Sequence, residues 1–444
     1  MKLHSETYDS YKKTEGEWSE TIPSEWQEKR VKDIFRLVTD AAPADNDYEL
    51  LSVYAGIGVK PRKDLEARGN KASSTDGYWI VRKNDIVVNK LLAWMGAVGL
   101  SEYDGVTSPA YDVLRQVGKD VDPRYYAYLF RTETAKKIFR KNSRGIMDMR
   151  LRLYFDKLGA ISVPVPSYQE QAEISDYLDK EISLINRKIG LIQNKVNLNI
   201  KLKQSLIDEA TYRGVCNDIE LIKSDNDFIK SIPEGWEEKR IEDVAAVIDP
   251  QPDHRAPAFA KGEGYPYLGI RDINRDGTFN FSTARKVELS AVEKQERAFK
   301  VEQGDIVFCK VGTLGEPRIV RPHGRFAISA TLVLIKTYKN GIGRFLKYVL
   351  ESSQIKHQIG LMGSGATRPA LGIKQIRKFF LSCPPKSEQE TIADYLDERL
   401  TLIDNVIKNL KSQIDGLIRL KSALVNDALI GRIKLAPENV EKGL

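Results

Sequence analysis

The sequence predicts an α+β protein with two globular domains and two long helices, which pair as an antiparallel coiled coil and give the chain an internal pseudo-two-fold repeat. Three observations lead to this prediction. The chain has 444 residues, more than one ordinary hydrophobic core contains. A set of short motifs occurs twice in the same order, and each copy ends in a long heptad pattern.

The repeat consists of three pairs of matching segments. The first begins with Ile-Pro-x-x-Trp, the second is Asp-Ile-Val followed by a lysine, and the third combines Glu-Gln with Asp-Tyr-Leu-Asp. The pairs are residues 22–34 with 232–244, 85–90 with 305–310, and 170–179 with 388–397. The shared order and nearly constant offset indicate a duplicated unit with small insertions.

The middles of the two halves differ. Residues 40–80 and 249–300 share almost nothing that aligns. Surface loops also diverge freely, but these stretches are too long and too rich in apolar residues to be loops alone. We interpret the chain as one framework that carries two different binding surfaces.

Each globular domain is expected to contain short buried strands and a longer helical region. The strands follow turn residues, and the helical regions have apolar residues three and four positions apart. The expected elements are strands at 85–88, 160–163, 305–308 and 379–382, and helices at 124–140 and 343–359.

Each half closes with a helix of about 45 residues, roughly 70 Å long at 1.5 Å per residue. Ser167 and Glu170 have capping-box spacing at the start of the first helix, and Pro384 and Pro385 precede the second. The apolar seam positions are Leu178, Ile182, Ile185, Ile189, Ile192 and Val196 in the first helix, and Leu396, Leu400, Ile403, Ile407, Leu410, Ile414 and Leu417 in the second.

A seam of this length has no single domain to pack against, so we expect the two helices to pack on each other. Homodimerisation through either helix is the alternative. Residues 194–203, where the seam loses its regularity, are a candidate surface for another protein. The expected boundaries are an N-terminal tail at 1–20, a first domain at 21–166, a first helix at 167–214, a linker at 215–230, a second domain at 231–384, a second helix at 385–431 and a C-terminal tail at 432–444.

The composition limits the class of protein. Hydrophobic residues make up 41% and charged residues 30%, as in a folded globular chain. No signal peptide and no apolar run of about 18 residues is present, so we expect a cytoplasmic protein without a membrane partner. The three cysteines are far apart and are expected to be free thiols. A net charge of +7 suggests a polyanionic partner without identifying one.

Basic residues collect in the expected loops of both domains. Small polar turns at 142–145 and 363–368 could approach phosphates through their backbone amides, while arginines could reach phosphates or guanine edges. Any one basic residue of this kind is more often a solvated surface residue than a DNA contact, so the prediction depends on the group. The candidate DNA-binding residues are Lys60, Arg62, Lys63, Lys90, Arg144 and Arg150 in the first half, and Arg271, Lys310, Arg318, Ser364 and Arg368 in the second.

Motifs of the common catalytic classes are missing. The sequence has no G-x-x-x-x-G-K-[ST] loop for ATP and no Asn-Pro-Pro-Tyr or Asp-Pro-Pro-Tyr motif of an amino-methyltransferase. The four histidines are scattered, without the spacing of metal ligands. We therefore predict a binding protein with no catalytic residues, metal site or cofactor of its own.

The doubled order of these motifs over residues 21 to about 431 resembles the specificity (S) subunit of Type I restriction–modification systems. The resemblance implies two target recognition domains, each of which reads one half of a bipartite, asymmetric double-stranded DNA site. The long helices would set the gap between the half-sites and dock two modification (methyltransferase) subunits, and Leu178, Ile185, Ile192, Leu396, Ile403 and Leu410 mark these docking helices. S-adenosylmethionine, ATP and Mg²⁺ would be bound by the methyltransferase subunits and the restriction (translocase/nuclease) subunits.

Two departures from the pattern are visible: Tyr168 and Gln169 precede the first Glu-Gln pair, and the first half lacks a clear glycine-rich copy of residues 363–367. The main alternative function is a two-headed coiled-coil adaptor that binds proteins without DNA specificity. A non-specific nucleic-acid binder, an enzyme of another class and the S-type subunit of a bifunctional restriction system are the others.

Overall fold

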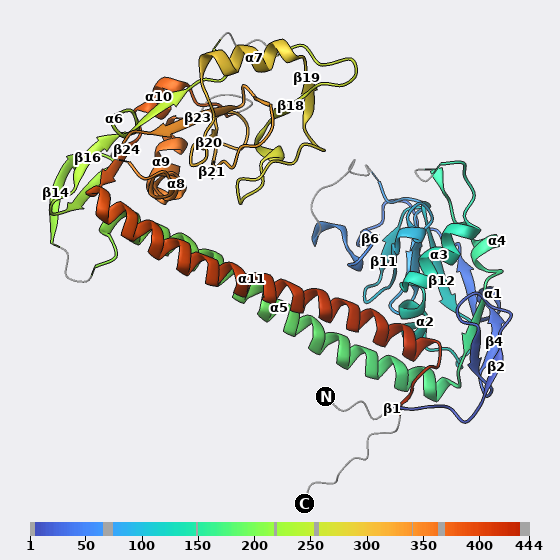
Figure 1. The fold of residues 1–444 in the computed structure, drawn as a ribbon. Helices are drawn as coiled ribbons and strands as arrows, with labels where there is room; N and C mark the ends of the chain where they lie inside the picture. The colour runs from blue at the N-terminus through green and yellow to red at the C-terminus, as the bar shows by residue number, and fades with distance from the viewer. Residues whose placement is uncertain are drawn as a thin grey trace, which may run out of the picture. The chain divides into compact units, whose positions relative to one another are not determined.

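The computed structural model describes residues 5–64, 74–147, 150–216, 220–252, 257–339, 341–362 and 369–435. The chain forms two compact units. Unit 1 comprises Met1–Ile192 and Ser412–Leu444, and unit 2 comprises Gln193–Lys411. Each unit contains a globular α+β part together with a portion of each long helix (Figure 1), which confirms the predicted fold class.

The globular part of unit 1 is built on a four-stranded antiparallel sheet in the order β10-β9-β12-β5. Its strands are β5 (Phe35–Val38), β9 (Ile86–Asn89), β10 (Val98–Leu100) and β12 (Tyr111–Gln116). Every residue of β9 is buried, as expected for a central strand. The residue before the Asp-Ile-Val motif, Asn84, has a φ of 72°, which explains why a turn-forming residue stands there.

Short strand pairs surround this sheet. They are β1 (Ser5–Glu6) with β25 (Lys434–Leu435), β2 (Tyr11–Lys13) with β3 (Thr21–Pro23), β4 (Gln27–Arg30) with β13 (Ser162–Val165), β6 (Leu51–Tyr54) with β7 (Gly58–Pro61), and β8 (Trp79–Val81) with β11 (Gly105–Thr107). The helical segments are α1 (Val31–Ile34), η1 (Arg62–Asp64), η2 (Ala93–Met95), α2 (Pro123–Leu129), α3 (Glu133–Asn142) and α4 (Phe155–Leu158).

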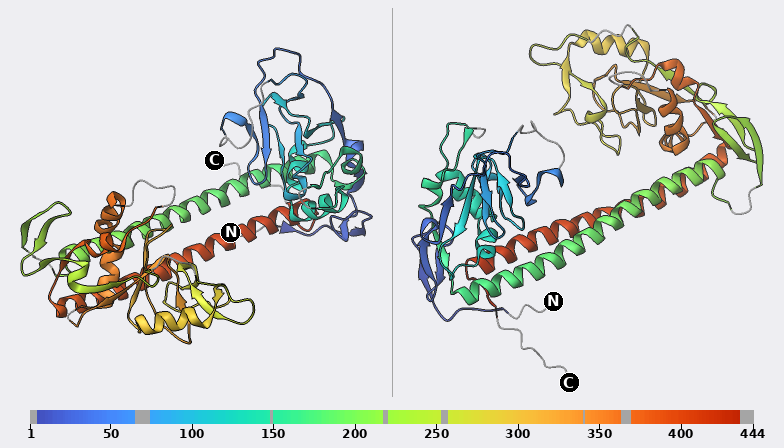
Figure 2. Two further views of the ribbon diagram at one scale, coloured as in Figure 1. Left: turned by 90° about the horizontal axis from the view of Figure 1, so that it is seen from above. Right: turned by 180° about the vertical axis from the view of Figure 1, so that it is seen from behind.

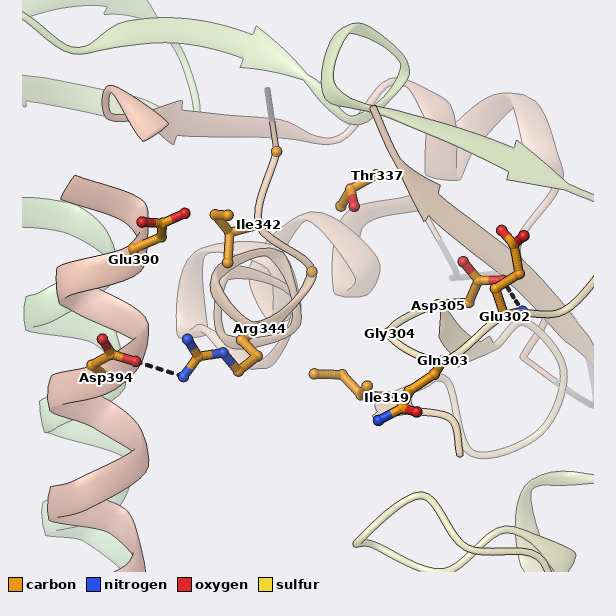
Figure 3. Close-up of a pocket in the computed structure, with 12 residues that line it drawn as sticks. Glu302, Gln303, Gly304, Asp305, Ile319, Thr337, Ile342, Arg344, Glu390 and Asp394 are labelled. Carbon is orange, nitrogen blue, oxygen red and sulfur yellow. Dashed lines mark hydrogen bonds and ion pairs between the residues drawn. The ribbon is translucent and has the colours of Figure 1, made fainter. Parts of the chain in front are cut away.

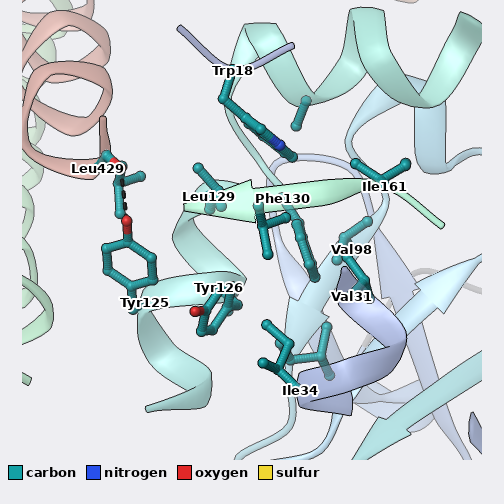
Figure 4. Packing of buried hydrophobic residues seen from close by; sticks show 14 of the residues in the cluster. Trp18, Val31, Ile34, Val98, Tyr125, Tyr126, Leu129, Phe130, Ile161 and Leu429 are labelled. Carbon is teal, nitrogen blue, oxygen red and sulfur yellow. Dashed lines mark hydrogen bonds between the residues drawn. The ribbon is translucent and has the colours of Figure 1, made fainter. Parts of the chain in front are cut away.

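The main core of unit 1 lies between this sheet, α2 and the long helices. Tyr125, Tyr126 and Phe130 are fully buried and contact one another edge-on or at a tilt. The Tyr125 hydroxyl donates a hydrogen bond of 2.7 Å to the carbonyl of Leu429, so the end of the second long helix is part of this core (Figure 4). Burial raises the pKa of Tyr125 well above its usual value, so the phenol is neutral.

Unit 2 repeats the central sheet in the order β17-β23-β20-β21. The four strands, β17 (Ala245–Ile248), β20 (Ile306–Cys309), β21 (Gly315–Ile319) and β23 (Leu332–Thr337), correspond in order to β5, β9, β10 and β12. The pairs β14 (Leu221–Asn226) with β15 (Ile229–Pro233) and β16 (Glu237–Arg240) with β24 (Phe380–Cys383) correspond to β2–β3 and β4–β13. The helices are α6 (Ile241–Val244), η4 (Ile270–Asp272), α7 (Leu289–Ala298), α8 (Gly343–Glu351), α9 (Ser353–Met362) and α10 (Ile373–Arg377).

Unit 2 differs from unit 1 in the structure that covers its central sheet. β18 (Tyr265–Leu268) pairs antiparallel with β19 (Arg285–Val287) and parallel with β22 (Ala327–Ile328). The buried side chain of Gln295 in α7 bonds to both backbone groups of Ile328, at 2.8 Å each, and fixes this helix on β22. The divergent middles therefore form different structures, as the poor alignment predicted.

The two long helices are α5 (Tyr168–Arg213) and α11 (Lys386–Leu429). The first part of α5 lies beside the last part of α11 in unit 1, and the last part of α5 lies beside the first part of α11 in unit 2 (Figure 2). In unit 1, Lys421 donates a hydrogen bond of 2.9 Å to the side chain of Asn186, and in unit 2, Lys203 forms an ion pair of 2.6 Å with Asp404. The helices are therefore antiparallel, as predicted.

Two expected boundaries are corrected. Part of the N-terminal tail expected at 1–20 forms β1 and β2, and the linker expected at 215–230 contains most of the β14–β15 hairpin. The first segment is polar, and the second is interrupted by the polar run 224–227, which hid their strands from pattern analysis, yet each pairs with a neighbouring strand through the backbone. Within the described parts of the chain, none of the helices combines the length and apolar character that a membrane span requires.

Candidate nucleic-acid interface

The end of β7 and the η1 turn that follows it carry three of the predicted residues of unit 1: Lys60, Arg62 and Lys63. Lys60 donates a hydrogen bond of 3.2 Å to the Tyr103 hydroxyl, and its ammonium lies 5.3 Å from the centre of that ring. Burial raises the pKa of Tyr111, and the charge of the nearby Arg62 guanidinium acts against that rise. We name these five residues the β7 patch. Cationic and aromatic side chains together suit a surface that contacts phosphates and bases.

The charges of the β7 patch are maintained by acidic neighbours. The hydrogen bond to Tyr103 and the nearby Glu102, 3.6 Å away, raise the pKa of Lys60. The 2.5 Å contact with Glu49 raises the pKa of the exposed Lys63. Both ammonium groups are therefore charged at neutral pH. Because these pairs are largely open to solvent, a phosphate could compete with the carboxylates for either lysine.

A second basic surface in unit 1 is the loop after α3. Arg144 and Arg152 exchange two backbone hydrogen bonds of 2.9 Å, which close the base of the loop. The Arg144 side chain pairs with Asp156 at 2.7 Å, and Arg150 is exposed. Ile146 is fully exposed in the same loop. An arginine can contact a phosphate, and an exposed apolar side chain beside it can contact a base methyl group.

The lysines of the repeated Asp-Ile-Val motif are paired with aspartates and are largely shielded from solvent. Lys310 is 5% exposed, and its ammonium pairs with Asp249 at 2.8 Å. Lys90 pairs with the buried Asp112 at 3.3 Å, and burial raises the pKa of that carboxyl against the opposing effect of the lysine. The Lys90 backbone carbonyl accepts a hydrogen bond from Leu153, and that of Lys310 from Leu371. In the described structure these lysines therefore hold neighbouring segments together.

The predicted residues of unit 2 have different environments. Arg318 is largely buried, donates to the carbonyl of Ile270 at 2.6 Å and also bonds to the carbonyl of Ile273. It thereby fixes η4, from which Arg271 extends as an exposed side chain. Ser364 and Arg368 lie outside the described residues.

An aromatic cluster of unit 2 was not predicted. The exposed His323 ring stacks on Phe279 at a centroid distance of 5.6 Å and lies 4.6 Å from Phe281. Phe326 contacts Phe279 edge-on at 4.9 Å. Its sequence signal is the density of aromatic residues in the divergent stretch at 259–281. Phe279 belongs to the small core of unit 2, and Phe281 and Phe326 are half-buried against that core, so His323 is the exposed ring of the cluster. An exposed ring of this kind is a candidate for stacking on a base.

The Ile-Pro-x-x-Trp and Glu-Gln motifs meet in both units. The Trp26 indole donates to Glu170 at 3.0 Å, and the Trp236 indole donates to Glu388 at the same distance. The glutamines next to these glutamates are buried. Each accepts a hydrogen bond from the backbone amide of the residue that precedes a helix: Gln171 from Asp122, before α2, and Gln389 from Ile342, before α8. The motifs that identified the repeat therefore attach each globular part to its long helix.

The six residues that marked the docking helices lie on the inner sides of α5 and α11. Leu178 belongs to the unit 1 core and Leu396 to the unit 2 core, and both are fully buried. Ile185 and Ile192 are buried, Ile403 packs against the unit 2 core, and Leu410 is half-buried. Other apolar side chains of α5 face outward: Leu184, Leu191 and Leu198, at a spacing of seven, are exposed.

A pocket of about 430 Å³ opens in unit 2 between the sheet, α8 and α11 (Figure 3). Glu302, Asp305, Glu390 and Asp394 line it beside a single cation, Arg344. Three of these carboxylates have cationic partners: Lys336 pairs with Glu302 and Asp305, and Arg344 pairs with Asp394. Among the described residues, no group of three or more histidine, cysteine, aspartate or glutamate side chains has the arrangement of a metal site.

Comparison with known proteins identifies both halves. Residues 23–198 and 233–415 match the family model of the type I restriction modification DNA specificity domain. The chain is 23% identical over 446 residues to the putative type I restriction enzyme MjaX specificity subunit of Methanocaldococcus jannaschii, which covers 96% of this chain and 97% of that protein. It is 22% identical over 290 residues to the EcoBI specificity subunit of Escherichia coli, covering 61% and 58% of the two chains.

Solved structures show the same fold. The HsdS subunit from Thermoanaerobacter tengcongensis has a TM-score of 0.52 at 16% identity, with 92% of this chain and 98% of that chain covered. A chain from the structural work on complex assembly and conformational transition of the type I R-M system has a TM-score of 0.70 at 17% identity, with 92% and 99% covered.

Proposed function

Because the chain belongs to the family of type I restriction–modification DNA specificity subunits, we propose that each of its two units reads one half of a bipartite, asymmetric double-stranded DNA site. Subunits of this family recognise DNA sequence and are non-catalytic. The observation that supports two different half-sites is the contrast within the repeat. The sheet order and the helix attachments are the same in both units, while the structures that cover the sheets differ.

The reading surfaces that we propose follow from exposure and charge. In unit 1 they are the β7 patch and the loop that carries Arg144 and Arg150. In unit 2 they are Arg271 on its η4 turn and the exposed His323, which stacks on Phe279. Ser364 and Arg368 remain candidates from the sequence. Lys90, Lys310 and Arg318 support these surfaces indirectly, because their charged groups are engaged inside the protein.

We further propose that α5 and α11 set the gap between the half-sites and dock two methyltransferase subunits. The seam residues pack inward, so the contact surface would consist of outward residues such as Leu184, Leu191 and Leu198. S-adenosylmethionine would be bound by the methyltransferase subunits. ATP and Mg²⁺ would be bound by restriction subunits where these are present.

The test is methylation of a randomised DNA library by the full chain assembled with its methyltransferase subunits. We expect methylated molecules to share two short defined sequences separated by a gap of fixed length. Replacing Arg62 by alanine should relax selection in one half-site only, at a cost of about 1–3 kcal/mol if it contacts a base. Arg36→Ala, an exposed side chain of β5 outside the proposed reading and docking surfaces, is the control.

Two outcomes would contradict the proposal. A protein adaptor without DNA specificity would give no enriched sequence and no steep fall of DNA affinity with salt. A single reading surface would give relaxed selection in both half-sites after the Arg62 replacement.

A further inference from the structure

The repeated Asp-Tyr-Leu-Asp motif has no role in the proposed reading of DNA. It occupies residues 176–179 of α5 and 394–397 of α11, close to the point where each globular part meets its long helix. The central leucine of each copy is fully buried in the core of its unit. Both aspartates of each copy instead lie at the surface, and both units use them in the same way.

In unit 2 the aspartates bind one arginine of α8. Arg344 Nη1 donates to Asp394 Oδ1 at 2.7 Å and to Asp397 Oδ2 at 2.6 Å, and the Asp394 contact is visible in Figure 3. The Tyr348 hydroxyl, one turn along α8, donates to the other oxygen of Asp397 at 2.5 Å. Two residues of α8 are thus tied to two residues of α11. We call this set of four the arginine clamp of unit 2.

Unit 1 contains the same clamp between α2 and α5. Arg124 Nη1 donates to Asp176 at 2.6 Å and to Asp179 at 3.2 Å, and the Tyr128 hydroxyl donates to Asp179 at 2.5 Å. Hydrogen bonding to these carboxylates raises the pKa of Arg344, and hydrogen bonding to Asp122 and Asp176 raises that of Arg124, so both arginines stay charged.

The clamps are poorly placed to stabilise the fold. Asp176 is 70% exposed and Asp394 is 68% exposed, and charge pairs in water contribute little to the free energy of unfolding. Their geometry, in contrast, is restrictive. One guanidinium bridges two carboxylates three residues apart on a helix, so a rotation of α8 against α11 would stretch one contact or the other. The apolar packing beside the clamp has no such directional preference.

We propose that Arg124 and Arg344 are positioning residues that fix the angle between each reading surface and its long helix, and thereby restrict the gap at which both half-sites are read. This inference rests on the proposed function. It assigns the clamps a role in spacing and none in the choice of bases, because their side chains are committed to the helix aspartates.

The two clamps differ in one neighbour. Asp122, which precedes α2, accepts bonds from Arg124 Nε and Nη2 at 3.1 and 2.8 Å, so the unit 1 arginine is also held by its own domain. The equivalent residue before α8 is Ile342, which offers no carboxylate. Arg344 therefore depends on the α11 aspartates more than Arg124 depends on those of α5, and its loss should affect spacing more.

The experiment measures methylation of DNA duplexes that carry both half-sites, with the gap varied one base pair at a time, by the full chain assembled with its methyltransferase subunits. Arg344→Ala should weaken the preference for the optimal gap. The ratio of methylation at gaps one base pair longer or shorter to methylation at the optimal gap should rise about fivefold, the factor that corresponds to a surface charge pair. Arg344→Lys should restore part of the selectivity, and Arg124→Ala should give a smaller change. Arg399→Ala, an exposed arginine over the Tyr395 ring, is the matched control.

Tyr348→Phe removes a single hydroxyl and leaves the core intact, so it should broaden the gap preference slightly even if Arg344→Ala proves unstable. An unchanged gap preference in both Arg344→Ala and Tyr348→Phe would overturn the clamp's role. Relaxed base selection with an unchanged gap would also overturn it. If the unaltered protein selects no bipartite site, the proposed function itself fails.

Discussion

Units 1 and 2 use the same order of strands in their central sheets but cover those sheets differently. In unit 1 the β6–β7 and β8–β11 pairs enclose a small separate core around Leu51, Val53 and Val81. In unit 2 the corresponding space holds a three-stranded sheet and α7, with a separate core around Leu268 and Leu332. The attachments to the long helices, in contrast, use the same tryptophan, glutamate and glutamine in both units.

This contrast shows where the protein tolerates change. In each unit, buried contacts join the long helix to a strand or turn, and such contacts allow little variation. They are made by Trp26, Glu170 and Gln171 in unit 1 and by their counterparts in unit 2. The covering structures have small cores of their own and can change without disturbing that attachment. Four predictions test the contrast, in order of decreasing effect.

Replacing Trp26 by alanine should lower the free energy of unfolding of unit 1 by about 4 kcal/mol, because the side chain is 1% exposed and its indole bonds to Glu170. Hydrogen exchange of the full chain would show the loss as faster exchange in β4, β13 and the start of α5. Trp236→Ala should act in the same way on unit 2. Equal acceleration in both units after either replacement would show that the two cores are not separate.

Replacing Lys310 by methionine should cost about 3 kcal/mol, since it leaves the carboxylate of Asp249 without its partner in a mostly buried site. The dependence of DNA affinity on salt should stay the same, because this lysine is not at the surface. Lys90→Met should cost less, since Lys90 is more exposed and lies farther from its partner. A weaker salt dependence in a stable Lys310→Met protein would return Lys310 to the group of DNA-binding residues.

Replacing Gln171 by leucine should cost about 2 kcal/mol, because the Asp122 amide and the Pro166 carbonyl lose their buried partner. Gln389→Leu should cost a similar amount in unit 2, where the Ile342 amide loses its acceptor. Chemical denaturation measures both. Gln169→Leu, an exposed change in the same helix turn, should be nearly neutral. A similar cost for Gln169 would mean that the buried bonds are not the cause.

Replacing Arg144 by alanine should change the free energy of unfolding by less than about 0.5 kcal/mol, since its pair with Asp156 is open to solvent. If Arg144 contacts a phosphate, the slope of log affinity against log salt should fall by about one. Asp156→Asn, which frees the arginine, should leave that slope unchanged or steeper. An unaltered slope in the alanine variant would exclude Arg144 from the DNA contacts.

The sequence predicted much of the framework because its signals are local or repeated. The heptads of α5 and α11, the capping-box spacing of Ser167 and the motif pairs each depend on residues close together in the chain. The candidate site was harder to predict. Lys60, Arg62 and Lys63 lie together, but pattern analysis could not foresee that Tyr103, between β10 and β11, and Tyr111 of β12 lie beside them.

The sequence by itself determined that this chain is a duplicated α+β unit with two long antiparallel helices, because periodicity and repetition are properties of the order of residues. Only the tertiary structure decided which charged residues are available. Lys310 looked like a surface cation, yet it pairs with Asp249, 61 positions away. The Asp-Tyr-Leu-Asp motif was only a marker of the repeat in the sequence, yet its aspartates bind Arg124 and Arg344, which lie at least 50 positions earlier in the chain. Such partners meet only when the fold brings distant segments together, so their roles cannot be read from local pattern.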